Sequence, residues 1–143
     1  MNKKLFIDSD IILDVLAERD DFYESAAGLF DLGYEKKLNL YTTAVVLANV
    51  FYILRKKFGM EKSREQLKKL RTIIGVLPIT EKTVDSALIS KFGDFEDALQ
   101  YFSARENKIQ VFITRNTRDY REKDLIVQTA EEYLSAIAGT GFG

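Results

Sequence analysis

The sequence of 143 residues contains no cysteine and no histidine. These absences exclude disulfide bonds, a cysteine nucleophile and zinc sites built from Cys and His. They also exclude a Ser-His-Asp triad. Any chemistry must therefore use carboxylates, amides, hydroxyls, lysine or arginine. Oxygen ligands of this kind suit hard cations such as Mg²⁺ or Mn²⁺.

The chain also lacks a large net charge and a long apolar run. Its formal net charge is −1, so the charge does not imply a strongly basic nucleic-acid binder. We interpret the basic groups at residues 55–57 and 64–71 as solvated helix faces. The longest apolar stretch, about residues 43–54, contains Asn49 and is too short to span a membrane. Asp8 and Asp10 interrupt the first apolar run too early for a signal peptide. We expect a cytoplasmic protein.

Length and composition indicate one globular domain. The chain is 46% hydrophobic and 30% charged, which is ordinary for a domain with its own core. We expect a single domain over residues 1–138 and a flexible, glycine-rich tail over residues 139–143.

Short apolar segments alternate with amphipathic ones along the chain. The pattern predicts strands at residues 4–7, 38–41, 76–79, 110–114 and 125–127, the third at a sheet edge because it contains the only proline. It predicts helices at residues 9–16, 22–37, 43–58, 61–74, 81–90, 95–106 and 130–138, several of them beginning after a capping Ser, Thr or Asp. We take Ser9 as the cap of the first helix. This alternation is typical of an α/β fold with a mostly parallel sheet between helices.

The stretch LFIDSDIILDVL, residues 5–16, places three aspartates inside an apolar run. Aspartate is a poor strand former and is costly to bury without a partner. In open α/β sheets, ligands bind outside the carboxyl ends of the strands. Asp8 follows the first predicted strand, and TRNTRD, residues 114–119, follows the fourth. Two acid-bearing segments therefore fall where this architecture places its sites.

Each candidate acid also has a purely structural explanation. Asp8 could end a strand, Asp94 could cap the helix that starts in GDFEDA, and Asp119 could be an ordinary turn residue. Asp97 is harder to explain, because it lies at helical spacing beside residues that should be buried. Asn49 lies on an apolar stripe, so it is either a satisfied core amide or helix-contact residue, or a polar group that points into a site.

Electrostatics decides what a convergence of these acids would mean. Two carboxylates about 4 Å apart repel by roughly 4 kcal/mol at an effective dielectric constant near 20. Converging acids therefore shift their pKa values or require a cation. A divalent ion removes the conflict, lowers the pKa of a bound water and polarises a phosphoryl oxygen. If the acids converge, the sequence indicates a Mg²⁺ or Mn²⁺ site for phosphoryl chemistry.

Four segments, taken together, resemble the PIN-domain family and its bacterial branch of VapC-like toxins. They are FIDSDIILDVL, TTAVVLANVFYILRK, DFEDALQYFSA and VFITRNTRDY, in that order and over essentially the whole chain. The resemblance implies a three-layer α/β/α fold around a mostly parallel sheet of about four to five strands. It implies a metal-dependent endoribonuclease of the toxin–antitoxin type, in which metal-activated water hydrolyses a phosphodiester. It also implies an RNA substrate, a small antitoxin partner and a homodimer.

The resemblance further implies the site residues. Asp8, Asp97 and Asp119 match the catalytic, metal-binding acids, and Asp94 matches an additional metal-binding acid. Thr114 and Asn116 match a polar pair that positions the acids or the phosphate, and Arg115 and Arg118 are candidates for guiding the RNA backbone.

Two positions depart from the usual pattern of the family. Asp10 stands where the family usually has Asn, which adds negative charge, and Asn49 stands where it usually has Glu. An amide oxygen can coordinate a hard metal, but an amide cannot act as a base or supply charge.

Three other interpretations stay open at this point. IDSD also resembles the start of haloacid-dehalogenase-type phosphatases, with Asp8 as nucleophile and Asp10 as acid, although Ile12 stands where Thr or Val is expected and a convincing later Lys and acid pair is missing. A response-regulator receiver would need a phospho-acceptor and Lys pair that we do not find. The third is a PIN-like module with little or no turnover that binds RNA or protein, and Asn49 is its best support.

Overall fold

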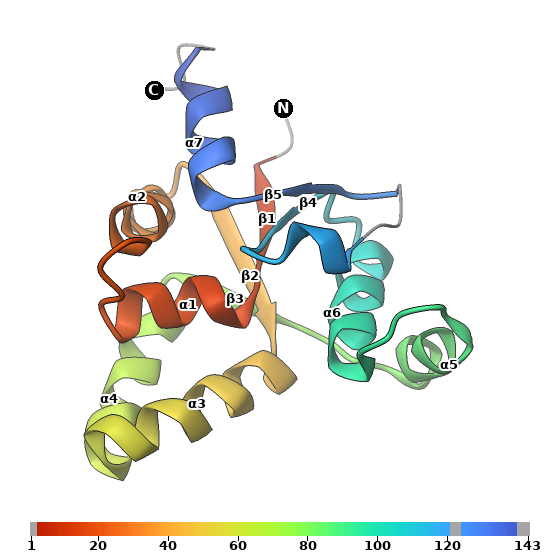
Figure 1. Cartoon of the computed structure of the whole chain (residues 1–143), viewed down its shortest axis with the longest axis horizontal. Helices are drawn as coiled ribbons and strands as arrows, with labels where there is room; N and C mark the ends of the chain where they lie inside the picture. Colours follow the sequence, from red (N-terminus) through yellow and green to blue (C-terminus); the bar gives the residue numbers. More distant parts are fainter. Residues whose placement is uncertain (1–2, 121–123, 140–143) are drawn as a thin grey trace.

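The computed structural model describes residues 3–120 and 124–139 and contains a single five-stranded sheet (Figure 1). The strands are β1 (Lys4–Ile7), β2 (Asn39–Thr43), β3 (Ile74–Leu77), β4 (Val111–Ile113) and β5 (Ile126–Gln128). They lie in the order β3-β2-β1-β4-β5, and each neighbouring pair is parallel. The predicted α/β class is confirmed, and the described sheet is wholly parallel. Of the predicted tail, only Gly139 lies within the described residues.

Seven α-helices within the described part of the chain flank this sheet. They are α1 (Ser9–Leu16), α2 (Tyr23–Tyr34), α3 (Ala44–Phe58), α4 (Met60–Arg71), α5 (Glu81–Ile89), α6 (Phe95–Glu106) and α7 (Ala130–Ala138). In Figure 1, α1, α2 and α7 lie on one side of the strands, and α5 and α6 on the other. The arrangement is the predicted three-layer α/β/α sandwich. A turn of 3₁₀ helix, η1 (Thr117–Asp119), follows β4.

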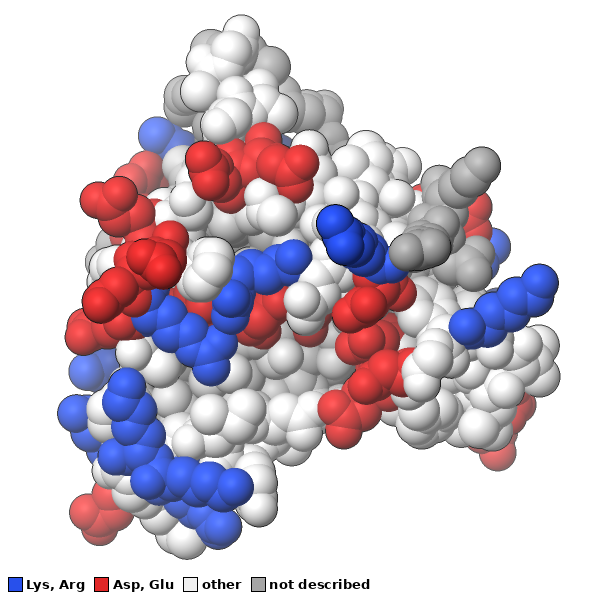
Figure 2. Space-filling view, viewed as in Figure 1, with Lys and Arg blue, Asp and Glu red and all other residues white. Residues whose placement is uncertain are grey.

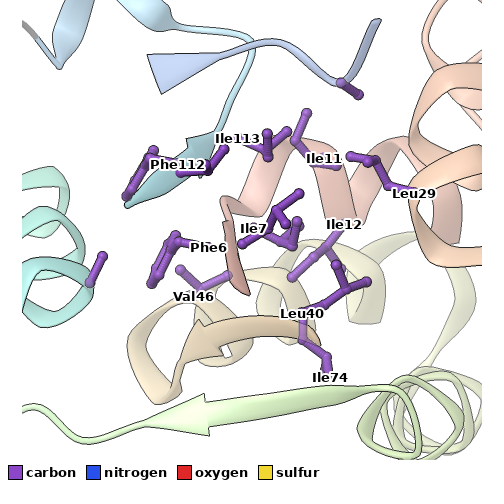
Figure 3. Close-up of a cluster of buried hydrophobic side chains, with 14 of the residues drawn as sticks. Phe6, Ile7, Ile11, Ile12, Leu29, Leu40, Val46, Ile74, Phe112 and Ile113 are labelled. Atoms are coloured by element: carbon purple, nitrogen blue, oxygen red, sulfur yellow. The ribbon is translucent and has the colours of Figure 1, made fainter. Parts of the chain in front are cut away.

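The buried core holds β1 and β4 side by side at the centre of the sheet. Phe6 of β1 and Phe112 of β4 are paired in register, and their rings stack with centroids 4.6 Å apart. Both are fully buried, and Figure 3 shows them beside Ile7 and Ile113 of the same strands. A strand covered on both faces needs apolar residues along its whole length. This packing brings the carboxyl ends of the two strands to one place.

Most helix starts and stops follow from short local signals. The side chains of four residues accept a hydrogen bond from the backbone N–H three positions further on, as N-caps do: Thr43, Thr80, Asp94 and Thr129. Gly59 ends α3 with a φ of 85°, a conformation that glycine adopts without strain. Across the described residues, no helix combines the length and the apolar character that crossing a bilayer requires.

The first helix starts differently from the prediction. Asp8, rather than Ser9, is its N-cap, and Asp8 Oδ1 accepts a hydrogen bond of 2.8 Å from the N–H of Ser9. Ser9 is the first helical residue instead. The first candidate acid is therefore held by the helix that it begins.

Three other predicted boundaries are wrong by a few residues. The edge strand β3 spans Ile74–Leu77, and Pro78 follows it rather than lying inside it. Consequently α4 ends at Arg71, before the strand begins. The second helix ends at Tyr34, and Lys36 has a φ of 62°, which an α-helix cannot continue through.

Basic side chains gather over α3 and α4, at the lower left of Figure 2. The last turn of α3 carries Arg55, Lys56 and Lys57, and the last turn of α4 carries Lys68, Lys69 and Arg71. Most of these residues are exposed, in agreement with their interpretation as solvated helix faces. The Lys56 ammonium lies 4.4 Å from the ring centroid of Tyr52.

Candidate active site

Asp8 and Thr114 meet where β1 and β4 end. The backbone N–H of Asp8 donates to the carbonyl of Ile113 at 3.0 Å, which continues the pairing of the two strands by one residue. Both side chains are buried, Asp8 with 5% of its surface exposed and Thr114 with none. The Thr114 hydroxyl lies 2.9 Å from Asp8 Oδ2 and 3.3 Å from Asp10 Oδ2. One hydroxyl has one proton to donate, so the two carboxylates compete for it.

Asp10 lies in the first turn of α1, and its two oxygens have different surroundings. Oδ2 accepts a hydrogen bond of 3.0 Å from the backbone N–H of Arg115. Oδ1 is buried and has no hydrogen-bond partner among the described residues. A buried carboxylate oxygen without a donor is costly, and a cation would satisfy it.

Burial and mutual repulsion raise the pKa values of these acids. Burial raises the pKa of Asp8 from 3.8 to about 7, and the neighbouring charge of Asp10 adds to the effect. Burial likewise raises the pKa of Asp10. The pKa of Asp97 is raised mainly by burial, and the charges of Asp94, Asp119 and Glu96 contribute. The site therefore favours either bound protons or a compensating cation.

Tyr120 connects the buried acids to those on α6. Its hydroxyl lies 3.0 Å from Asp97 Oδ1 and 3.3 Å from Asp8 Oδ2. Burial and the two carboxylates raise the pKa of Tyr120, so the hydroxyl stays protonated and acts as a donor. Sequence reasoning missed this residue. The available signal was an aromatic residue at the end of the polar segment TRNTRDY, where its ring packs 4.3 Å from that of Phe112.

An open cleft lies at the start of α6. It has a volume of about 550 Å³ and is lined by Lys91, Phe92, Gly93, Asp94, Asp97, Arg118 and Asp119. Asp94 Oδ1 accepts a hydrogen bond of 3.0 Å from the backbone N–H of Asp97, so the capping interpretation of Asp94 is confirmed. Asp94 also lines the cleft, so its role as a helix cap does not exclude a role in binding a metal ion. Figure 2 shows acidic side chains gathered beside α6.

The segment after β4 places its polar residues in different ways. The N–H of Asn116 donates to the Thr114 hydroxyl at 3.2 Å, and the Asn116 carbonyl accepts from the N–H of Asp119 at 3.1 Å. Asn116 therefore shapes the turn through its backbone, while Arg118 and Asp119 reach the cleft. This geometry orients the Thr114 hydroxyl toward the acids.

Arg115 lies against the protein rather than in the cleft. Its Nε is 3.2 Å from Oδ2 of the buried Asp14, and its guanidinium carbon lies 4.0 Å from the ring centroid of Phe22. Burial raises the pKa of Asp14, and the positive charge of Arg115 opposes that shift. Asp14, the third aspartate of the N-terminal stretch, thus fixes the Arg115 side chain. The backbone N–H of Arg115 in turn donates a hydrogen bond to Asp10.

Asn49 contacts a residue that sequence reasoning also missed. The Asn49 amide donates a hydrogen bond of 2.7 Å to Glu96 Oε2, between α3 and α6. Asn49 is half-buried, and Glu96 is exposed. Asn49 is therefore a helix-contact residue rather than a core amide, and its side chain reaches a carboxylate one position before Asp97.

The structure groups the predicted acids into two neighbouring sets. The buried set is Asp8 and Asp10 with Thr114, and the cleft set is Asp94, Asp97 and Asp119; Tyr120 connects the two. In residues 3–120 and 124–139, no three acidic side chains are arranged so that they could hold a metal ion as they stand. The donors nevertheless fit a hard cation in kind, because they are all oxygens, the pKa values of Asp8, Asp10 and Asp97 are raised, and Asp10 Oδ1 is unpaired.

Comparison with known proteins identifies the family. The family model described as PIN domain matches residues 4–118, most of the chain. The chain belongs to the PIN-domain family. Membership separates it from haloacid-dehalogenase-type phosphatases, and the strand order β3-β2-β1-β4-β5 differs from the 2-1-3-4-5 order of receiver domains.

This PIN domain is similar in sequence to a named ribonuclease and in fold to solved toxin structures. Ribonuclease VapC1 from Aquifex aeolicus (strain VF5) is 25% identical over 137 residues, which cover 92% of this chain and 94% of that protein. A toxin–antitoxin complex from Klebsiella pneumoniae contains a chain with a TM-score of 0.67 and 17% identity, covering 88% of this chain and 97% of that one. VapC20 from Mycobacterium tuberculosis, described as a Sarcin-Ricin loop cleaving toxin, has a TM-score of 0.61 and 19% identity, covering 76% and 86%. The two structures share this fold.

Proposed function

We propose that this PIN-domain protein is a divalent-metal-dependent endoribonuclease of the toxin–antitoxin type, acting in the cytoplasm. The observation that carries the proposal is the connection of Asp8 to Asp97 through the Tyr120 hydroxyl. It brings acids that are far apart in the sequence to one site that contains no histidine. The names of Ribonuclease VapC1 and of the Sarcin-Ricin loop cleaving toxin VapC20 support RNA as the substrate.

In this proposal Asp8, Asp97 and Asp119 hold Mg²⁺ or Mn²⁺, and Asp94 and the unpaired oxygen of Asp10 assist. When bound, such a cation supplies Lewis acidity that activates water and stabilises charge on phosphoryl oxygens.

The other residues of the site position these acids. Thr114 donates to Asp8 or Asp10, and the N–H of Arg115 holds Asp10 Oδ2. Asp94 caps α6 and so fixes the backbone at Asp97. Without a cation, Asp8 takes up a proton near neutral pH, because its pKa is about 7.

Basic residues beside the acids are proposed to bind the RNA backbone. Arg118 and Lys91 line the cleft with Asp94, Asp97 and Asp119, where a phosphodiester must lie to be cut. Arg115, fixed by Asp14 and Phe22, would present its remaining guanidinium N–H groups to a phosphate beside the buried acids.

A cleavage assay with matched variants tests the proposed reaction. The purified protein should cut RNA internally with Mg²⁺ or Mn²⁺ and stop when EDTA is added. Asp8→Asn and Asp97→Asn should each lower the rate on the order of 100-fold or more, with an unchanged circular dichroism spectrum. The control Asp31→Asn, an exposed acid on α2, should retain full activity. Full activity in either site variant would contradict the proposal.

The alternative function is a PIN-like module that binds RNA or protein without turnover. Asn49 favours it, because an amide stands where the family usually has a carboxylate. Tight RNA binding without cleavage in Mg²⁺ or Mn²⁺ would support this module and overturn the nuclease.

We also propose a small antitoxin partner and a homodimer. The likeness to a chain of the Klebsiella pneumoniae toxin–antitoxin complex supports the antitoxin, and the VapC-like sequence resemblance supports the homodimer. A dimer of this 16.4 kDa chain should elute in light-scattering chromatography at about twice that mass. A monomer at micromolar concentration would contradict the dimer, and a gene neighbourhood without a small DNA-binding protein would count against the antitoxin.

A further inference from the structure

The hydrogen bond between Asn49 and Glu96 joins two helices that are 47 positions apart in sequence. The Asn49 amide nitrogen of α3 lies 2.7 Å from Oε2 of Glu96 in α6. An exposed glutamate ordinarily keeps much of its rotamer freedom, because nothing offsets the entropy cost of fixing it. Here a half-buried donor on a neighbouring helix holds one oxygen of the carboxylate.

The partner in this contact is neutral, which distinguishes it from a surface ion pair. A lysine or arginine at residue 49 would hold the carboxylate but cancel its charge. An amide N–H fixes the position and leaves the charge in place. The Asn49 side chain therefore orients Glu96 without neutralising it.

The first turn of α6 places this charge beside the cleft. Asp94 is the N-cap, and Glu96 and Asp97 are the second and third helical residues. Asp94 and Asp97 line the cleft. The charge of Glu96 also contributes to the raised pKa of Asp97, so it acts on the site electrostatically.

A simpler explanation of Glu96 is the helix dipole. Negative side chains stabilise the first turn of any helix. Glu131 has the same explanation, because it is the exposed second residue of α7. The dipole accounts for a glutamate at this position, but it does not account for a donor from α3 that holds it.

We propose that Glu96 is a further carboxylate of the cation site and that Asn49 is its positioning residue. The inference rests on the proposed metal-dependent function. In this arrangement α3 contributes an amide, and α6 contributes the charge.

Calorimetric titration of the metal-free protein with Mn²⁺ tests this inference without relying on activity. Glu96→Gln should weaken Mn²⁺ binding about 10-fold, as loss of a supporting carboxylate does. Glu131→Gln removes the same charge from the equivalent position of another helix and should leave the affinity unchanged. Asn49→Leu keeps the charge of Glu96 but removes the donor that holds its carboxylate. It should therefore weaken Mn²⁺ binding by a smaller factor, about 3-fold.

Reversing the pair separates positioning from charge alone. In Asn49→Asp combined with Glu96→Gln, the amide at residue 96 can donate to a carboxylate at residue 49. This double variant should recover most of the affinity lost in Glu96→Gln. Urea denaturation of each variant confirms that it is folded during the titration.

The outcomes distinguish this inference from the proposed function. If Asp8→Asn abolishes Mn²⁺ binding while Glu96→Gln binds like the natural sequence, the role of Glu96 is overturned and the nuclease site stands. Equal losses in Glu96→Gln and Glu131→Gln would also overturn it, because they would show a general charge effect. If the natural protein binds no Mn²⁺, or if Asp8→Asn binds it normally, the proposed function fails and this inference fails with it.

Discussion

The two sets of acids in the site are held in different ways. Asp8 and Asp10 lie beside the ends of the central strands, where a hydroxyl and backbone N–H groups fix every carboxylate oxygen except Oδ1 of Asp10. Asp94 and Asp119 are exposed and line an open cleft, and they belong to a helix start and to the turn after β4. The Tyr120 hydroxyl lies within hydrogen-bond distance of both Asp8 and Asp97 and can donate its one proton to either of them.

This difference indicates where the protein gives up stability for its site. A buried carboxylate with a raised pKa opposes folding at neutral pH, whereas an exposed one at a helix start stabilises the fold. We therefore expect changes to the buried set to alter both stability and metal binding. Changes to the cleft set should alter metal and RNA binding with smaller effects on stability.

The largest expected effect on stability is in its dependence on pH. Asp8 has a pKa of about 7 in the folded protein against an ordinary value of 3.8, so the folded state holds the proton more tightly than the unfolded state. The free energy of unfolding should therefore fall as the pH rises from about 4 to about 7, by up to about 1.4 kcal/mol per pH unit from this group.

Urea denaturation in EDTA at several pH values measures this slope. Asp8→Asn should flatten it and should be more stable than the natural sequence at pH 7.5. Asp94→Asn, in the cleft set, should change the slope much less, because Asp94 only adds to the raised pKa of Asp97. Equal slopes for Asp8→Asn and the natural protein would remove the distinction between the two sets.

A smaller effect is expected from the shared hydroxyl of the buried set. Thr114→Val should cost about 1–3 kcal/mol, because the buried carboxylates lose one donor and the N–H of Asn116 loses its acceptor. Thr42→Val is a matched control, since the buried Thr42 hydroxyl donates at 2.9 Å to the uncharged carbonyl of Ile7. Hydrogen bonds from Thr114 lower the pKa values of Asp8 and Asp10. Only Thr114→Val should therefore shift the pH dependence of stability to higher pH. Identical pH dependence in the two variants would contradict the role of Thr114 as a donor to the acids.

The smallest expected effect on stability lies in the cleft. Asp94→Ala should cost about 1 kcal/mol, because α6 loses its N-cap. Asp94→Ser should restore the cap and most of the stability, but not the charge. Thermal unfolding measures the first effect and Mn²⁺ titration the second. If Asp94→Ser binds Mn²⁺ like the natural protein, Asp94 is a cap and not a ligand.

Much of the fold could be predicted because its signals are local. Thr43, Thr80 and Thr129 cap helices by accepting a hydrogen bond from the backbone N–H only three residues further on. The buried strands are apolar along nearly their whole length. The position of β3 could not be predicted as well. Its register depends on pairing with β2, where Ile74 lies opposite Leu40, and that pairing joins distant parts of the chain.

The same division applies to the site. Asp8 and Thr114 could be placed from the rule that sites lie at the carboxyl ends of strands. Tyr120 and Glu96 could not, because their roles depend on partners 112 and 47 positions away. Asn49 was recognisable as a polar residue on an apolar stripe, but its sequence context does not reveal which side chain it contacts.

Our proposal depends on Asp8, Asp97 and Asp119 together holding one or two divalent cations. Crystals grown with Mn²⁺ and measured for anomalous scattering test it most directly. We expect the strongest anomalous peak at about 2.2 Å from carboxylate oxygens of Asp8 and Asp97, with the Tyr120 hydroxyl moved away from at least one of them. A strongest peak elsewhere on the protein, or no peak while Tyr120 still bridges the two acids, would contradict the claim.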